Sequence, residues 1–173
     1  MDIKLVIRPA DFDDAQAMHR MRLQPKVMSG ITSTPDERLA KMVNYLKNAD
    51  SNTRILVAEY DDQVVGSISM ALGRGRRRHI GYLGMIVDEN YHGQGIGSRL
   101  LTEMLNIADN YFNLVRVELE VLADNNRAIA FYQRNGFGSE GLQKYALIKD
   151  GVYADIIIMA RYNEKLLPGG VTS

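Results

Sequence analysis

The stretch Val87–Leu101, VDENYHGQGIGSRLL, decides how the rest of this chain is interpreted. It has the pattern of a strand end, a short turn, a corner with glycine at positions 93, 95 and 97, and the first turns of a helix. Upstream, residues 80–87 (IGYLGMIV) are almost continuously apolar, as in a strand covered on both faces. Downstream, apolar side chains recur at helical spacing: Ile96, Leu100, Leu101, Met104, Leu105, Ala108 and Tyr111. The stretch therefore predicts a strand–turn–helix unit.

The glycine-rich corner has the chemistry of an anion site. Glycine has no side chain to keep a ligand away from the main chain, and the first N–H groups of a helix have no partner inside the helix. The helix dipole adds partial positive charge at the same place, so the corner predicts a phosphate site. A tight turn without a ligand is the alternative, and one glycine-rich loop does not decide between the two.

Two other nucleotide-binding motifs fit this corner poorly. A P-loop requires Lys and then Ser or Thr after its last glycine, and no Lys follows Gly97. The dinucleotide fingerprint G-x-G-x-x-G requires a third glycine where this chain has Ser98. Its second mark is an acidic residue about 20 positions later, which Glu118 or Glu120 could supply. Too little chain remains for a doubly wound sheet, so the dinucleotide alternative is weak.

The corner and a second segment together resemble a known family. The run from His92 to Gly97 (HGQGIG) is similar to the (Q/R)-x-x-G-x-(G/A) coenzyme A signature of the GCN5-related N-acetyltransferases (GNAT). About thirty residues later, Asn125–Phe137 (NNRAIAFYQRNGF) resembles the family's second signature, N-x-x-A-I-x-x-Y-x-x-x-G-F. The resemblance extends from about Ile3 to Tyr162. One departure is His92, in place of Gln or Arg; a neutral imidazole can still donate one hydrogen bond to a phosphate.

The resemblance implies acetyl-coenzyme A as cosubstrate. In the family, the strands matching residues 80–87 and 115–121 splay apart at one end, the pantetheine arm enters that gap, and a main-chain N–H of the first strand receives the thioester oxygen. Asn125 would contact the pantetheine, although it can also cap a helix. The residues expected to bind the coenzyme are Met85, Ile86, Val87, His92, Gly93, Gln94, Gly95, Ile96, Gly97, Ser98, Asn125 and Tyr132.

The candidate catalytic residues are Tyr132, Glu118 and Asp155. Because the chain has no cysteine and no Ser-His-Asp signature, we expect direct attack of an amine on the thioester in a ternary complex. The family resemblance places Tyr132 as the general acid; the alternative is that it only packs under the sheet. For the general base, Glu118 and Asp155 are the candidates, and the alternative for Glu118 is an ion pair with Arg116 on a solvated face. No metal-ligand spacing occurs, so we expect no metal.

Composition sets the broader limits. The 173 residues are 46% hydrophobic and 24% charged, and the 21 basic residues equal the 21 acidic ones, so no net field attracts nucleic acid or a membrane. No apolar run reaches the ~20 residues of a membrane span, and there is no signal-peptide pattern, so we expect a cytoplasmic protein. We expect one domain over residues 1–162 and a flexible tail over 163–173.

By pattern, the fold is α/β: a mixed sheet with helices on both faces. The resemblance implies the GNAT fold, with a mostly antiparallel sheet. In the third strand, Val64, Ile68, Met70 and Leu72 are expected to share a face, and Thr34 with Glu37 forms a capping box that predicts a helix start. The expected strands are 3–8, 54–60, 63–72, 80–87, 115–121, 137–148 and 152–162, with a hairpin turn at Asp61–Asp62 and apolar side chains alternating along 115–121. The expected helices are 11–23, with Ala15, Met18 and Met21 on its inner face, one from Thr34 to about Asn48, one from Ile96, and 125–135. Residues 24–33 are expected to form a loop.

The acceptor is indicated only in outline. The chain resembles the bacterial amino-acid N-acyltransferase-like branch of the family in a basic loop before the central strand and in the pattern of its ending. The residues that carry this resemblance are Arg74–Arg78, Lys144–Leu147, Gly151, Tyr153, Asp155 and Met159–Arg161. The resemblance implies a small-molecule amine such as an amino acid. An arginine of the loop 74–78 could bind its carboxylate; alternatives are a solvated hairpin tip or the 3′-phosphate of the coenzyme. Two other functions remain open, namely a protein N-terminal or lysine acetyltransferase and a non-catalytic acyl-coenzyme A sensor. Dimers are common in the family, which implies a possible homodimer.

Overall fold

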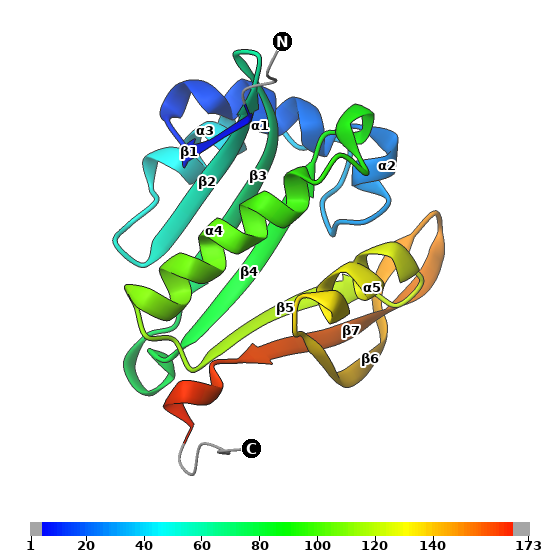
Figure 1. Cartoon of the computed structure of the whole chain (residues 1–173). Coiled ribbons are helices and arrows are strands. Elements are labelled where there is room, and N and C mark those ends of the chain that lie inside the picture. The colour runs from blue at the N-terminus through cyan, green and yellow to red at the C-terminus, as the bar shows by residue number, and fades with distance from the viewer. Residues whose placement is uncertain (1–4, 168–173) are drawn as a thin grey trace. The chain divides into compact units, whose positions relative to one another are not determined.

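The computed structural model describes residues 5–167, which form two compact units. The first runs up to Ala71 and includes Gly84–Asn106; the second contains Leu72–Leu83 and the residues from Ile107 onward (Figure 1). The strands are β1 Leu5–Pro9, β2 Thr53–Tyr60, β3 Gln63–Leu72, β4 Ile80–Val87, β5 Arg116–Leu122, β6 Gly138–Lys149 and β7 Val152–Tyr162. The helices are α1 Ala15–Arg22, α2 Pro25–Met28, α3 Leu39–Lys47, α4 Ile96–Asn110 and α5 Asn126–Arg134.

The seven strands follow the order β1-β2-β3-β4-β5-β7-β6. Strands β4 and β5 pair in parallel, whereas β1 with β2, β2 with β3, β5 with β7 and β6 with β7 pair antiparallel. This confirms the predicted mixed, mostly antiparallel sheet. The parallel register runs from Ile80 opposite Arg116 to Tyr82 opposite Glu118. The predicted splay beyond that register stays a prediction.

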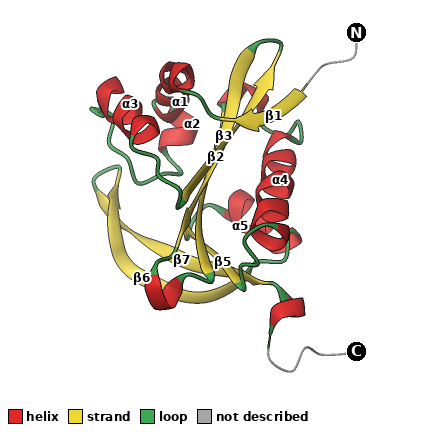
Figure 2. Cartoon of the chain, turned by 90° about the vertical axis from the view of Figure 1, so that its left-hand side faces the viewer, coloured by secondary structure: helices red, strands yellow, loops and turns green. Residues whose placement is uncertain are grey.

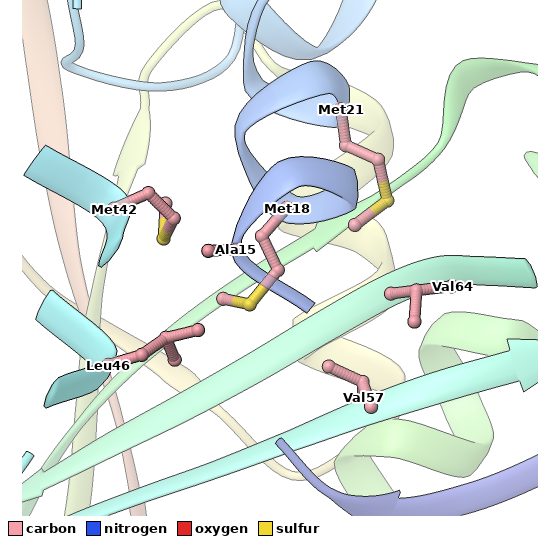
Figure 3. Packing of buried hydrophobic residues seen from close by; sticks show 7 residues of the cluster. All are labelled: Ala15, Met18, Met21, Met42, Leu46, Val57 and Val64. Carbon is pink, nitrogen blue, oxygen red and sulfur yellow. The ribbon is translucent and has the colours of Figure 1, made fainter. Parts of the chain in front are cut away.

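In the first unit, helices cover both faces of the strands. Figure 2 shows α1, α2 and α3 on one side of β1–β3 and α4 on the other. The inner side of α1 carries side chains at spacings of three residues, as predicted, and they pack with α3, β2 and β3 (Figure 3). This cluster consists of Ala15, Met18, Met21, Met42, Leu46, Val57 and Val64. On the opposite side, the inner residues of α4 (Ile96, Leu100, Leu101, Met104 and Ala108) are at most 2% exposed.

A bulge in the β2–β3 hairpin corrects the predicted face of Val64. Glu59 pairs with Val64 but Ala58 pairs with Gly66, so β3 contains one extra residue at this point. An extra residue reverses the alternation of side chains along a strand. Val64 therefore joins the cluster with α1, while a side chain at Gly66 would contact Leu100 of α4. The hairpin turn itself is as predicted: Asp61 and Asp62 have φ of 46° and 60°.

The predicted capping box at Thr34 is wrong. Helix α3 begins at Leu39, and the Thr34 hydroxyl bonds to Asp36 instead of a helix N–H. The Glu37 carboxylate is drawn into ion pairs with Arg22 and Lys41, so contacts with another helix outweigh the local signal. The preceding segment, predicted as a loop, contains the short helix α2, and residues 12–14 before α1 form a 3-10 turn instead of an α-helix.

In the second unit, β5 alternates as predicted. Its residues Val117, Leu119 and Val121 are at most 5% exposed, and Glu120 is exposed on the other face. The β6–β7 turn has φ of 50° at Asp150 and 79° at Gly151, as expected for Asp-Gly in a tight hairpin. Tyr111 is 75% exposed and does not continue the buried stripe of α4. In the predicted tail, Glu164–Leu166 forms a 3-10 helix, and residues 168–173 lie outside the described part.

Candidate active site

Hydrogen bonds within the first unit hold Asp88, the residue that follows strand β4, in place. Asp88 is 2% exposed, and its main-chain N–H donates to the Val65 carbonyl at 2.9 Å. Its carboxylate accepts hydrogen bonds from the Asn90 N–H at 3.0 Å and from the Arg20 guanidinium at 3.3 Å. A buried carboxylate with these partners holds the turn after the strand in place. No local pattern predicts the Arg20–Asp88 pair, because the two residues are 68 positions apart in the chain.

The glycine corner has the geometry that an anion site requires. Gly93 and Gly95 have φ of +82° and +81°, a region that residues with a side chain rarely adopt. A Cβ atom built at either position would meet nothing within 4 Å, so these glycines border open space instead of relieving crowding. Gly93, Gln94 and Gly95 are exposed to solvent. The corner is therefore set by backbone conformation and is accessible to a ligand.

Helix α4 begins immediately after this corner. Its first helical hydrogen bond is donated by Arg99 N–H to the Gly95 carbonyl, at 3.1 Å. The N–H groups of Ile96, Gly97 and Ser98 precede that bond, in the turn where helix N–H groups have no partner within the helix. Ile96 is buried and anchors the turn, whereas Ser98 is exposed. A phosphate would fit here through the main chain, which offers open backbone, helix N–H groups without partners inside the helix, and the positive end of the dipole.

His92 bonds within the protein. Its Nε2 lies 2.9 Å from the Val87 carbonyl oxygen, and because a carbonyl only accepts, the ring nitrogen donates this bond. His92 therefore links the glycine corner to the end of β4, and its contact with a phosphate stays a prediction. The side-chain amide of Gln94, which is exposed, donates a hydrogen bond to the Asn90 carbonyl at 3.3 Å. The end of β4 that the corner meets (Met85, Ile86 and Val87) is partly buried.

The second unit holds the second signature segment. Asn125 caps α5, since its side-chain oxygen accepts from the Ala128 N–H at 3.2 Å. Helix α5 ends before Gly136, which has φ of +86°. Asn125 therefore acts as the helix cap that the sequence offered as the alternative, and its contact with a pantetheine stays a prediction.

Tyr132 is buried among aromatic rings. It is 7% exposed, and its ring meets Phe131 and Phe137 edge to face, with centroids 5.2 Å and 5.6 Å apart. Burial raises the pKa of the Tyr132 phenol to about 12, because a phenolate would lose its hydration. At neutral pH the hydroxyl therefore keeps its proton, which a general acid needs.

The two candidate bases each have a partner in the second unit. Glu118 accepts from the Arg116 guanidinium at 2.6 Å, and Arg77 lies 3.7 Å away. This is the ion pair that the sequence offered as the alternative to catalysis. The Oδ1 atom of Asp155 accepts from the Tyr145 N–H at 2.8 Å. Tyr145 has φ of +55° at an irregularity in β6, which gives Asp155 a structural role that the sequence did not show.

The arginine loop between β3 and β4 is tightly closed. A Cβ atom at Gly73 would lie 2.1 Å from the Arg77 carbonyl oxygen, so only glycine fits there. The Arg77 guanidinium lies over the Tyr82 ring, 5.4 Å from its centroid, as well as near Glu118. Arg76, Arg77 and Arg78 are exposed, so the loop presents positive charge to solvent.

Two further features are absent from the part of the chain that the structure describes. Over residues 5–167, no three His, Cys, Asp or Glu side chains gather in a way that could hold a metal ion. No helix in that part of the chain is long and apolar enough to cross a membrane. The structure thus gathers residues 85–98 at one corner of the first unit, and places Asn125, Tyr132, Glu118 and Asp155 in the second.

Comparisons with known proteins agree with this geometry. Residues 16–137 match the Acetyltransferase (GNAT) family. L-amino acid N-acetyltransferase AaaT of Escherichia coli (strain K12) is 33% identical over 166 residues, which cover 91% of this chain and 98% of that protein. Spermidine N(1)-acetyltransferase of the same strain is 24% identical over 163 residues, or 93% and 87% of the two chains. Ribosomal-protein-alanine N-acetyltransferase from Brucella melitensis superposes with a TM-score of 0.81 at 27% identity, covering 91% of this chain and 99% of that one.

Proposed function

The chain belongs to the acetyltransferase (GNAT) family, and on that basis we propose that it transfers an acetyl group from acetyl-coenzyme A to the amine of a small metabolite, with an amino acid as the first candidate. The observation that carries this proposal is the corner at Gly93 and Gly95: open backbone at positive φ leading into the first turn of α4. Such a corner suits the pyrophosphate of a coenzyme. The similarity to an L-amino acid N-acetyltransferase over nearly the full length of both chains supports the acceptor class.

The chain's residues would divide the work as follows. Acetyl-coenzyme A supplies the thioester whose carbonyl carbon the amine attacks. The N–H groups of Ile96, Gly97 and Ser98, with the glycines before them, hold the pyrophosphate, and a main-chain N–H in Met85–Val87 stabilises the tetrahedral oxygen. One donor of that kind typically lowers the barrier by about 3 kcal/mol. His92 fixes the corner to β4, through its bond to the Val87 carbonyl.

Proton transfer is assigned to side chains of the second unit. As the carbon–sulfur bond breaks, Tyr132 donates its hydroxyl proton to the leaving thiolate, a role its burial suits by keeping the phenol neutral. The attacking amine must lose a proton, and we propose Glu118 or Asp155, acting through a water, as the group that collects it. Glu118 would have to do so beside Arg116, and Asp155 while holding Tyr145.

One experiment tests the function directly. Release of coenzyme A thiol from acetyl-coenzyme A is measured against free amino acids, polyamines and short peptides that begin with alanine. We expect turnover with at least one free amino acid and little with the peptides. Turnover only with peptides would overturn the small-molecule acceptor. Failure to bind acetyl-coenzyme A at all would overturn the assignment of the glycine corner.

A second acceptor class has a specific observation in its favour. The structure of a ribosomal-protein-alanine N-acetyltransferase is similar over nearly the whole chain at 27% identity. This similarity keeps a protein N-terminus as an alternative acceptor, and the peptides in the panel test it. Tight coenzyme binding without turnover on any amine would instead favour a sensor.

A further inference from the structure

One face of strand β3 carries two serines next to an apolar core. Ser67 pairs with Val57 and Ser69 pairs with Ile55, and residues paired across two strands place their side chains on the same face. Val57 belongs to the cluster under α1 (Figure 3), and Ile55 packs against that cluster. Ser67 and Ser69 therefore lie on the α1 side of the strands, where the neighbouring side chains are apolar.

Ser67 differs from the other buried polar residues between positions 5 and 167. Those residues are two aspartates, and each bonds to an arginine: Asp14 to Arg8 and Asp88 to Arg20. Ser67 is 6% exposed, and its hydroxyl makes no hydrogen bond with any residue of the described part. A buried hydroxyl without a partner costs free energy, so its presence points to a bond with something outside the chain.

The Ser67 hydroxyl also touches accessible space. Over residues 5–167, every fully enclosed side-chain oxygen or nitrogen has a hydrogen-bond partner. Because the Ser67 oxygen has none there, it is not fully enclosed. The next serine on this face, Ser69, is half-buried, and its hydroxyl also makes no hydrogen bond within the described part. Both hydroxyls are thus free to bond with a ligand.

Strand β4 lacks a side chain beside Ser69. Gly84 lies in the interior of β4, a strand with a neighbour on each side in the sheet, yet it is exposed. A Cβ atom built at Gly84 would meet the Ser69 Oγ atom at 3.6 Å and no other described atom within 4 Å, and the backbone there has no positive φ. The fold therefore has room for alanine at this position and does not require glycine. A glycine inside a strand often marks a place where a ligand approaches the main chain.

Gly84 and the two serines belong to one surface of the first unit. Gly84 is two positions before Ile86, which packs against the α1 cluster, so both positions face the α1 side. Ser67, Ser69 and Gly84 are called the serine face below. The serine face borders residues 85–87, where a main-chain N–H is proposed to receive the thioester oxygen. An amine that attacks this thioester has to approach the same part of β4.

We propose that the serine face binds the acceptor amine, with the hydroxyls of Ser67 and Ser69 as hydrogen-bonding groups and with Gly84 leaving room for the acceptor. This inference rests on the proposed transfer of an acetyl group to an amine. A serine hydroxyl donates to a carboxylate and accepts from an amine or ammonium. Neither hydroxyl is charged, and the strand residues beside them are aliphatic, so the face suits a small acceptor with one polar head, such as an amino acid. It does not suit a polyamine, whose several charges need carboxylates beside them.

The first test removes the two hydroxyls and leaves the apolar packing in place. Release of coenzyme A thiol by Ser67→Ala/Ser69→Ala is measured with a subsaturating mixture of the free L-amino acids other than cysteine. We expect the rate to fall about tenfold and the Kd for acetyl-coenzyme A to stay within about twofold of the wild-type value. The free energy of unfolding should stay equal or rise, because no hydrogen bond within the described part is lost. Ser51→Ala is the matched control, since Ser51 is an exposed serine of the same unit, in the turn before β2, and it should change none of the three.

The outcomes separate this inference from the proposed function. A wild type that releases no thiol with any amine overturns the proposed function and this inference with it. An active wild type whose rate the double variant leaves unchanged overturns this inference alone. So does a parallel loss of rate, coenzyme affinity and stability, which would make the serines structural. Faster thiol release by the wild type with spermidine than with the amino acids would overturn the acceptor class.

A second test fills the space at Gly84. Gly84→Ala is compared with Gly141→Ala in β6, because both are exposed strand glycines without positive φ, and a Cβ atom fits at both. Alanine should preserve or raise Tm at both positions, since it has less backbone freedom to lose on folding. Only Gly84→Ala should lower thiol release with the amino-acid mixture, by about tenfold, because its methyl group displaces the acceptor from the thioester. Full activity in Gly84→Ala would show that no acceptor approaches the main chain there and would overturn the inference.

Discussion

The imidazole of His92 donates a hydrogen bond to the main-chain carbonyl of Val87 across a distance of 2.9 Å, which links the glycine corner to the last residue of β4. Both ends of this bond belong to segments assigned to the coenzyme. We therefore predict that His92→Phe, which keeps a ring but removes the donor, raises KM for acetyl-coenzyme A about three- to tenfold, the range of one partly buried hydrogen bond.

The pattern of KM effects separates this positioning role from a general loss of structure. His92→Gln restores a side-chain N–H donor and should recover much of the affinity. KM for the amine should change little in either variant. His79→Phe is the control, since His79 is an exposed histidine outside the corner. Steady-state kinetics with each substrate varied in turn make the comparison, and an equal rise of KM for both substrates in His92→Phe would contradict the assignment.

The glycine corner gives a second prediction. Gly95→Ala meets no neighbouring atom but forces a side chain to φ near +81°, at a cost of about 1 kcal/mol in folding stability. Relaxation of that strain would move the N–H groups at the start of α4 and raise KM for acetyl-coenzyme A. Gly151→Ala carries nearly the same conformational cost, with φ of +79° and no neighbour within 4 Å, in the β6–β7 turn. Thermal unfolding should therefore show similar losses for both variants, and only Gly95→Ala should change KM. If KM for acetyl-coenzyme A rose in both variants, backbone strain alone would explain the effect, and the position of the α4 N–H groups would not.

The sequence predicted those parts of the fold that local patterns control. The alternation of β5, the turn at Asp61–Asp62 and the end of α5 before Gly136 follow from neighbouring residues, and all three are confirmed. It failed where distant residues compete. Glu37 looked like half of a capping box but is held by Arg22 of another helix, and the bulge that turns Val64 to the α1 side appears only in the pairing register.

The same division holds for the candidate site. The glycine corner was predictable because positive φ and a helix start leave marks in the local sequence. Three other contacts depend on side-chain directions, which no local pattern specifies. They are the bond from His92 to the Val87 carbonyl, the ion pair of buried Asp88 with Arg20, and the bond that the Asp155 carboxylate accepts from the Tyr145 N–H. Residue types therefore indicated the ligand class better than they indicated which carboxylate does chemistry.

Removal of the Tyr132 hydroxyl is the direct test of the general acid. Tyr132→Phe keeps the two edge-to-face contacts with Phe131 and Phe137, so the core should be preserved. General acid catalysis typically contributes 10²- to 10⁴-fold, and we expect kcat to fall by about 10²-fold while the Kd for acetyl-coenzyme A stays nearly constant. Calorimetry and turnover measured on the same preparation make the comparison. If coenzyme binding and kcat fall together, the tyrosine is a packing or binding residue.

The raised pKa of Tyr132 also predicts how stability changes at alkaline pH. The phenol has its ordinary pKa near 10 in the unfolded chain and about 12 in the folded one, because burial disfavours the charged form. Between these values the unfolded chain releases a proton that the folded chain keeps, so the free energy of unfolding falls as pH rises. The loss is on the order of 2–3 kcal/mol across that window. Urea unfolding at a series of alkaline pH values should show that the free energy of unfolding declines more steeply for the wild type than for Tyr132→Phe. Parallel curves for the two proteins would contradict the raised pKa of Tyr132.

The two candidate bases, Glu118 and Asp155, differ in the hydrogen bonds and ion pairs that their carboxylate oxygens already make. Glu118 is bonded by Arg116 and lies near Arg77, whereas the Tyr145 N–H engages only the Oδ1 atom of Asp155. An amide can replace either carboxylate as a hydrogen-bond acceptor but cannot take up a proton under these conditions. We therefore expect Asp155→Asn to lower kcat/KM more than Glu118→Gln, and to remove the acidic limb of the pH–rate profile. Asp155→Ala should in addition lower stability by about 1–2 kcal/mol, because the Tyr145 N–H loses its acceptor. Full activity in Asp155→Asn, with stability lost only in Asp155→Ala, would show that Asp155 holds the bulge of β6 and takes no proton.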